Sequence, residues 1–180
     1  AKDIEFIDTI IDFLKAKISL DETRIYSSGM SNGGYMSYHL ACNLDNTFAA
    51  VASVTGSMTP ETYDNCSPSH PTAAMQIHGL LDYTVPYNGN SGSKSIEDVI
   101  SYWVNYNSCD NNPETLIKYS NDNDLISIDT YIGWLNNVNV KLILHPEMGH
   151  TWPFTESYSI DASQEIWDFV SKYDIYGLIN

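Results

Sequence analysis

The chain has 180 residues, of which 43% are hydrophobic, and it carries a formal net charge of −15 at pH 7. This length is typical of one domain over residues 1–180, and the hydrophobic content excludes a largely disordered chain. The negative charge disfavours nucleic acid and anionic membrane surfaces as partners, because phosphates need a basic footprint. We expect no membrane span, since no run reaches about eighteen apolar residues.

Taken in chain order, the hydrophobic pattern predicts alternating helices and strands. Apolar residues recur at helical spacing over residues 3–18, 32–43, 95–106 and 160–173. Short apolar runs predict strands over residues 24–28, 48–54, 73–78, 125–132 and 140–145. The stretches 60–71 and 86–95 are expected to be loops. This alternation indicates an α/β fold, with a mostly parallel sheet covered by helices on both faces.

The most informative motif is the G-x-S-x-G pentapeptide Gly29-Met30-Ser31-Asn32-Gly33. It follows a predicted strand and opens a predicted helix, which is the context of a nucleophile elbow. Such a turn presents the serine hydroxyl above the sheet, and we expect both glycines to remove side chains that would collide there. The alternative is a serine in a glycine-rich helix start.

A serine nucleophile needs a base that takes its proton and a carboxylate that orients the base. Asp82 follows the strand 73–78 by a short loop, although an aspartate there could also cap a turn. His150 follows the strand 140–145 in a loop, and is our choice of base. Of the other histidines, His39 is interpreted as a helix-face residue and His78 as a structural residue that hydrogen-bonds nearby backbone. His70 lies between prolines in a loop, and His145 lies inside a strand, where its side chain is too fixed to reach across the site.

The oxyanion hole is only partly accounted for. The backbone N–H of Asn32, the residue after the nucleophile, is the expected first donor. The second donor normally comes from a loop after an earlier strand, and no such loop precedes Ser31 in this chain.

The three cysteines fit no zinc motif. Cys42 lies in an apolar helical run and is interpreted as a buried thiol. Cys66 and Cys109 lie in turn-rich segments, where they could form a disulfide bridge, and such a bridge would indicate export.

In its motifs and their order the chain resembles the polyhydroxybutyrate-depolymerase-type esterases, a family that includes feruloyl and acetylxylan esterases of the α/β-hydrolase fold. The resemblance runs from Asp3 to about Tyr173. Its most specific segments are Arg24-Ile25-Tyr26, Gly29-Met30-Ser31-Asn32-Gly33-Gly34-Tyr35-Met36, Phe48-Ala49-Ala50-Val51-Ala52, Gln76-Ile77-His78-Gly79 with Asp82 and Val85-Pro86-Tyr87, and Gly149-His150-Thr151-Trp152-Pro153.

This resemblance implies Ser31 as nucleophile, Asp82 as acid and His150 as base, in a secreted, extracellular or periplasmic enzyme without metal or cofactor. It also supports a Cys66–Cys109 bridge. Met30, Tyr87 and Trp152 are expected to line the substrate pocket; Trp103 is a further candidate, with core packing as the alternative.

Family members usually begin with several strands that have no counterpart here, so the chain resembles the carboxyl-terminal portion of a catalytic domain. The strand Arg24–Ser28 is then expected at an exposed sheet edge, which is a pairing hazard. We expect an amino-terminal segment, a second copy of the chain or a rearrangement to cover it.

The leading functional hypothesis is a serine esterase acting through an acyl-enzyme on a polymer-linked ester. The ester could be a feruloylated or acetylated polysaccharide, or a polyhydroxyalkanoate. The alternative is a catalytically silent hydrolase-like fragment that acts as a binding module. A peptidase or a lipase on the same fold is a third hypothesis, because fold alone does not settle the substrate.

Overall fold

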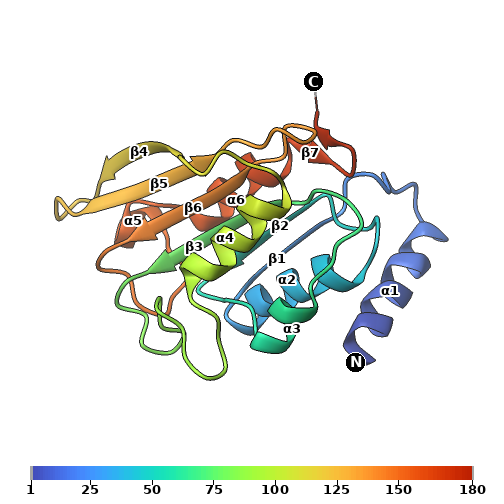
Figure 1. The fold of residues 1–180 in the computed structure, drawn as a ribbon, viewed down its shortest axis with the longest axis horizontal. Coiled ribbons are helices and arrows are strands. Elements are labelled where there is room, and N and C mark those ends of the chain that lie inside the picture. The colour runs from blue at the N-terminus through green and yellow to red at the C-terminus, as the bar shows by residue number, and fades with distance from the viewer. Residues whose placement is uncertain (1, 180) are drawn as a thin grey trace.

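The computed structural model describes residues 2–179, which form a central sheet flanked by helices (Figure 1). The sheet has six strands in the order β1-β2-β3-β6-β5-β4. In chain order these strands are β1 (Tyr26–Met30), β2 (Ala50–Val54), β3 (Ala73–Gly79), β4 (Glu114–Tyr119), β5 (Leu125–Tyr131) and β6 (Val140–His145). The helices are α1 (Lys2–Lys15), α2 (Asn32–Asn43), α3 (Pro60–Asn65), α4 (Ile96–Tyr106), α5 (Thr155–Tyr158) and α6 (Ala162–Val170), and a short hairpin of β7 (Tyr173–Asp174) and β8 (Gly177–Leu178) follows.

The direction of the strands decides where the loops gather. Strands β1, β2, β3 and β6 are parallel neighbours, whereas β5 pairs antiparallel with both β6 and β4. The carboxyl ends of the four parallel strands therefore meet at one edge of the sheet, where open α/β sheets place their sites. The loops after β1, β3 and β6 carry Ser31, Asp82 and His150, respectively.

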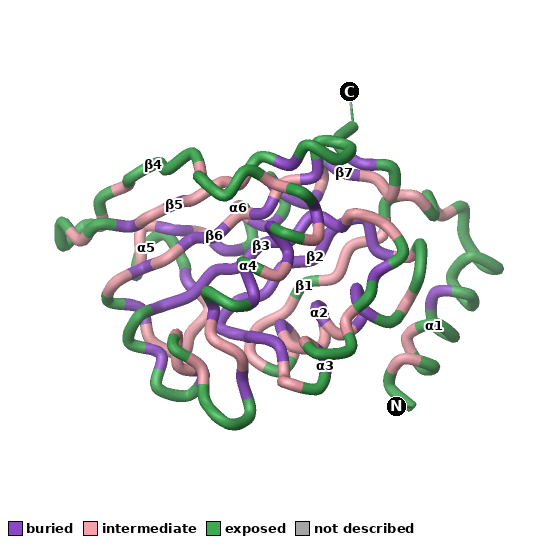
Figure 2. The backbone as a smooth tube through the Cα atoms, in the orientation of Figure 1, coloured by how far each residue is buried: buried purple, intermediate pink, exposed green. Residues whose placement is uncertain are grey.

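The core consists of two apolar layers, one on each face of the sheet. Along β2, Ala50, Ala52 and Val54 face a cluster built with α6, whereas Val51 faces a cluster built with α2 and α4. Every residue of β2 and β3 is buried, as the dark centre of Figure 2 shows. The nearly continuous apolar runs of the sequence thus belong to parallel strands covered on both faces, as predicted.

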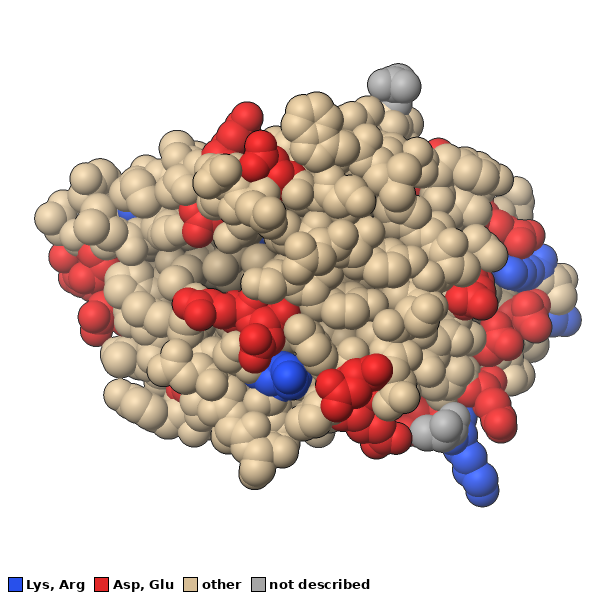
Figure 3. Space-filling model, viewed as in Figure 1, with Lys and Arg blue, Asp and Glu red and all other residues tan. Residues whose placement is uncertain are grey.

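Helix α1 forms as predicted but ends at Lys15, and Ile18 lies beyond it. Of its residues only Ile11 is fully buried, and Phe6 and Phe13 are 62% and 60% exposed. Figure 1 shows this helix at the margin of the molecule, beside α2 and away from the sheet. Carboxylates greatly outnumber basic side chains on the face drawn in Figure 3. Within residues 2–179 no helix is long and apolar enough to cross a membrane.

Several elements differ from the sequence prediction. Strand β1 covers Tyr26–Met30 rather than residues 24–28, and the short helix α5 was not predicted. Residues 60–65, expected as loop, form α3, which Thr59 caps by accepting the N–H of Thr62 and which starts at Pro60. This Thr-Pro pair was a readable helix start. Strand β4 was not predicted; its apolar residues Leu116, Ile117 and Tyr119 are all exposed, and none of its residues is buried. The last helix covers only residues 162–170, and Tyr173 instead begins the β7–β8 hairpin.

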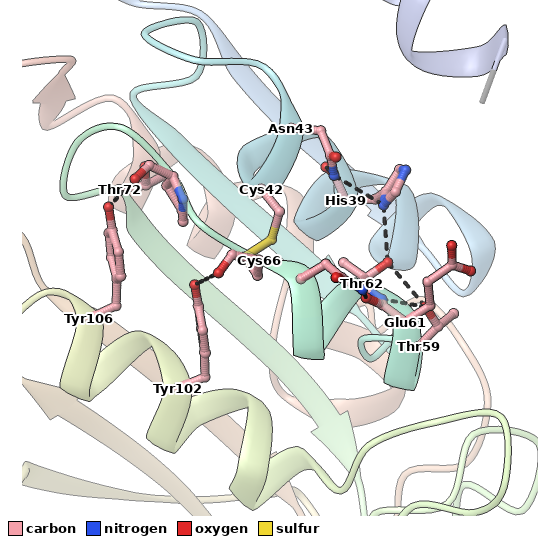
Figure 4. The surroundings of a disulfide bond; sticks show 12 residues. His39, Cys42, Asn43, Thr59, Glu61, Thr62, Cys66, Thr72, Tyr102 and Tyr106 are labelled. Carbon is pink, nitrogen blue, oxygen red and sulfur yellow. Dashed lines mark hydrogen bonds between the residues drawn. A yellow bond between two sulfur atoms is a disulfide. The ribbon is translucent and has the colours of Figure 1, made fainter.

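The disulfide prediction was wrong. Cys42 pairs with Cys66, and their Cα atoms lie 4.7 Å apart, whereas Cys109 is free (Figure 4). The end of α2 and the end of α3 pack side by side, and this packing brings Cys42 to Cys66. The Cys109 thiol instead faces the carbonyl of Val138, and burial raises its pKa to about 11.

Candidate active site

The turn between β1 and α2 presents Ser31 in an unusual backbone conformation. Its φ is 54° and its ψ is −119°, a combination that costs energy for a residue with a Cβ. The Ser31 N–H donates to the carbonyl of Val54 at 2.9 Å, and the Ser31 carbonyl accepts from Gly34 and Tyr35 in the first turn of α2. The turn is held at both ends, as a nucleophile elbow requires.

The two glycines of the motif are not equally constrained. A Cβ at Gly29 would lie 2.6 Å from the backbone of Gly33, so only glycine fits there without movement. A Cβ at Gly33 would meet no heavy atom within 4 Å. The expectation that both glycines prevent a collision was therefore wrong for Gly33, whose own Cβ position points into open space.

Asp82 lies in the loop after β3, and its side chain is fully buried. Its Oδ1 accepts the backbone N–H groups of Thr84 and Val85, both at 2.9 Å. Its Oδ2 lies 2.9 Å from Nδ1 of His150. Both oxygens of the carboxylate thus have hydrogen-bond partners. Two backbone N–H groups, which the sequence analysis did not predict, fix its orientation.

His150 joins the other two residues. Its Nδ1 faces Asp82 and its Nε2 lies 3.0 Å from Oγ of Ser31. Its loop packs against the Asp82 loop, since the N–H of Leu81 donates to the carbonyl of Met148. A Cβ at Gly79 would lie 1.8 Å from that same carbonyl, so the close approach of the two loops needs glycine. The structure therefore brings together the three predicted residues from segments up to 119 positions apart.

This geometry allows one direction of proton transfer. The Asp82 carboxylate accepts the Nδ1–H of His150, which leaves the Nε2 lone pair facing the Ser31 hydroxyl. A hydroxyl in that position can lose its proton to imidazole as it attacks a carbonyl.

The predicted oxyanion donor, Asn32, is the first residue of α2. N–H groups in the first turn of a helix have no intrahelical acceptor and lie at its positive end, where they suit a developing oxyanion. Among residues 2–179, only α1 and the segment that follows it precede β1, so there is no earlier strand whose following loop would supply the expected second donor.

The predicted substrate-binding residues lie on different sides of the sheet. Met30 and Trp152 pack against the cluster around α6. Tyr87 packs against the cluster around α4, and its hydroxyl lies 3.4 Å from Glu97. Trp103 is fully buried and stacks on Tyr38, so it is a core residue. A cavity of about 350 Å³ lies beside β1, lined by Trp152 with Tyr26, Ser28, Ser163, Ile166, Trp167 and Val170.

The other four histidines lie outside the triad. His78 and His145 are buried in or at the end of strands, and His39 and His70 hydrogen-bond Thr62 and the Phe48 carbonyl. Among residues 2–179, no three His, Cys, Asp or Glu side chains are placed to hold a metal ion.

A family model described as the prolyl oligopeptidase family matches residues 2–174. The chain belongs to this family. Among its relatives, a bifunctional acetylxylan esterase/xylanase from Neocallimastix patriciarum is 27% identical over 180 residues, covering 99% of this chain and 25% of that protein. A probable feruloyl esterase C from Aspergillus clavatus is 37% identical over 92 residues, covering 51% of this chain and 32% of that protein.

This member of the prolyl oligopeptidase family therefore spans about a quarter to a third of the curated relatives it matches. Its fold is similar to that of the acetyl xylan esterase from Aspergillus awamori, with a TM-score of 0.63 at 13% identity, over 93% of this chain and 66% of that chain. The predicted α/β-hydrolase fold and the predicted resemblance to feruloyl and acetylxylan esterases are confirmed. The resemblance to polyhydroxybutyrate depolymerases stays a prediction.

Proposed function

We propose that the chain carries the catalytic residues of a serine esterase. The observation that supports this most strongly is the continuous hydrogen-bonded series from Asp82 Oδ2 through His150 to Ser31 Oγ. Ser31 attacks the ester carbonyl while His150 takes its proton, and His150 then protonates the leaving alcohol. Water repeats the sequence on the acyl group. Asn32 N–H stabilises the oxyanion in both halves of the reaction.

The proposed substrate is an ester on a polymer. The names of the relatives, an acetylxylan esterase/xylanase and a feruloyl esterase, favour an acetylated or feruloylated polysaccharide over a polyhydroxyalkanoate. Met30 and Trp152 are proposed contacts for the bound acyl or alcohol part. Tyr87 is the weakest of the three candidates, because it packs on the α4 side of the sheet.

The proposed location is extracellular or periplasmic. The Cys42–Cys66 disulfide supports this, since structural disulfides persist mainly in oxidising compartments.

We also propose that further polypeptide, either a segment that precedes these residues or a second copy, covers the outer edge of β1. As expected, β1 is an edge strand, and β2 is its one neighbour among the strands described. Trp167 lines the cavity along β1 and is 60% exposed, so an added element that packs there would bury this apolar side chain. Such an element could also carry the second oxyanion donor.

The direct test is labelling with a fluorophosphonate, which reacts with activated serines. We expect labelling of the chain, none for Ser31→Ala or His150→Ala, and full labelling for the control Ser67→Ala, an exposed serine outside the site. Hydrolysis of short aryl esters, aryl acetates and feruloyl esters then identifies the acyl preference, with a peptide amide as the comparison. A folded chain that is not labelled would favour the binding-module alternative.

A further inference from the structure

The residues behind Asp82 form a buried polar network that the triad itself does not include. His78, on the central strand β3, is completely buried. Its Nε2 lies 2.9 Å from the carbonyl of Val85, and its Nδ1 lies 3.0 Å from Nε2 of Gln76. Gln76 lies two residues earlier on the same strand, so both side chains are on the same face of the sheet.

The network fixes which nitrogen of His78 carries the proton. The side-chain nitrogen of Gln76 faces the Gly56 carbonyl at 3.1 Å, and a carbonyl can only accept. The side-chain oxygen of Gln76 accepts from the hydroxyl of Tyr38 at 2.9 Å. The amide orientation is therefore determined, and Gln76 donates to Nδ1 of His78. His78 must then carry its proton on Nε2 and donate it to Val85.

Val85 connects this network to the triad. Its carbonyl accepts from His78, and its own N–H donates to Oδ1 of Asp82 at 2.9 Å. The Nε2–H of His78 also lies 3.8 Å from Oδ2 of Asp82, the oxygen that faces His150. The loop from Asp82 to Val85 is thus attached at its far end to a strand that is buried along its whole length.

We propose that His78 is a positioning residue: with its tautomer fixed by Gln76, it anchors Val85 and thereby holds the Asp82 carboxylate against His150. This role rests on the proposed esterase function. Because β3 is buried along its whole length, His78 gives the exposed loop a rigid reference point. Positioning of this kind matters, since a displacement of about 1 Å can cost about 100-fold in rate.

His78 also has to remain neutral for this geometry. Burial lowers its pKa, and the titratable groups nearest to it are Asp82, His150 and Tyr87. A second proton would place an Nδ1–H against the amide hydrogens of Gln76. A cation this close to Asp82 would also draw the carboxylate's interaction away from His150. Gln76 therefore keeps the negative charge of Asp82 available to the base.

The test compares two substitutions that both remove the imidazole ring. In His78→Gln the amide nitrogen reaches about the position of Nε2 and can donate to Val85, whereas in His78→Asn it reaches only the position of Nδ1. We expect His78→Asn to lower kcat for an aryl ester by about 10- to 100-fold with little change in KM, and His78→Gln to recover most of that loss. His39→Asn, on the helix α2, is the matched control.

A readout independent of turnover separates this role from the esterase proposal. The Nδ1–H proton of His150 gives a low-field NMR signal that reports its bond to Asp82, and His150→Ala identifies it. We expect His78→Asn to shift or broaden this signal and His78→Gln to leave it near its original position. If the unsubstituted chain hydrolyses no ester, the function fails, but this comparison still tests the positioning.

Gln76→Glu provides a second, electrostatic test. A carboxylate beside Nδ1 would favour a doubly protonated His78, and the resulting ion pair carries no net charge. Because the imidazolium Nε2 lies 3.8 Å from Oδ2 of Asp82, it would compete with His150 for that oxygen, and we expect a lower kcat. Equal kcat losses and equal thermal destabilisation in His78→Asn and His78→Gln, with an unmoved His150 signal, would overturn the proposal and leave His78 as a core-filling residue. That comparison decides the matter even if Gln76→Glu does not fold.

Discussion

Replacing Asp82 with asparagine separates the chemistry of the triad from the stability of its loop. The Asp82 side chain accepts the N–H groups of Thr84 and Val85 on Oδ1 and faces His150 with Oδ2. In Asp82→Asn the amide oxygen can keep the two backbone bonds, which leaves the NH₂ group facing Nδ1 of His150. The imidazole then has to accept at Nδ1 and carry its proton on Nε2.

A protonated Nε2 cannot take the Ser31 proton. Loss of the correct tautomer in a serine triad lowers kcat by about 10⁴-fold, which corresponds to about 5.5 kcal/mol. We expect a loss of this size in aryl-ester turnover, with the thermal midpoint nearly unchanged. Asp82→Ala removes the acceptor of two backbone N–H groups, and at about 1–3 kcal/mol each it should destabilise the fold by about 2–6 kcal/mol.

The assay measures kcat and the urea-unfolding free energy on the same preparations. The reasoning is refuted if Asp82→Asn retains activity within about tenfold of the unsubstituted chain, because His150 would then not depend on the carboxylate for its tautomer. It is equally refuted if Asp82→Asn and Asp82→Ala destabilise the fold to the same extent.

Three further predictions concern stability and assembly. The Cys42–Cys66 bridge closes a loop of sequence separation 24, so Cys66→Ser should lower the free energy of unfolding by about 3 kcal/mol in urea titrations, whereas Cys109→Ser should change it little. Burial lowers the pKa of His78 from its ordinary value of 6.5, so below pH 6.5 the unfolded chain binds more protons than the folded one. The contribution of His78 to the free energy of unfolding should therefore be complete above pH 6.5 and should fall as the pH drops towards the pKa of the folded state. In urea titrations at pH 5–8, His78→Gln should make the free energy of unfolding less dependent on pH. The backbone amides of β1 that face away from β2 should exchange rapidly in the chain alone and become protected when the covering segment or a second copy is present; slow exchange of these amides in a monomer would contradict a missing cover.

The sequence determined much of the architecture because its signals are local. The apolar runs of β2 and β3 reflect burial on both faces, and the helical periodicity of residues 96–106 reflects one buried face. Strand β4 was not predicted; its apolar residues are exposed, and it forms through pairing with β5 rather than through burial of one face.

Of the candidate site, only the three residues proposed to react could be predicted from the sequence. Ser31 carries a motif, and Asp82 and His150 follow strands whose carboxyl ends share one edge of a parallel sheet. The partners of Asp82 are backbone N–H groups, and those leave no mark on residue identity. The role of His78 depends on the side-chain orientation of Gln76, which only the surrounding atoms determine.

The cysteine pairing likewise depended on tertiary packing and not on the local sequence. The sequence placed Cys66 and Cys109 in similar turn-rich segments, and this local context together with the family resemblance favoured that pair. The packing of α2 against α3 instead brings Cys42 within bridging distance of Cys66 and leaves Cys109 beside Val138. By itself the sequence determined the fold class and singled out the three residues proposed to react, because the alternation of helices and strands and the motif chemistry are written in local patterns. Distances between segments far apart in the chain depend on tertiary packing, and only the structure could decide them.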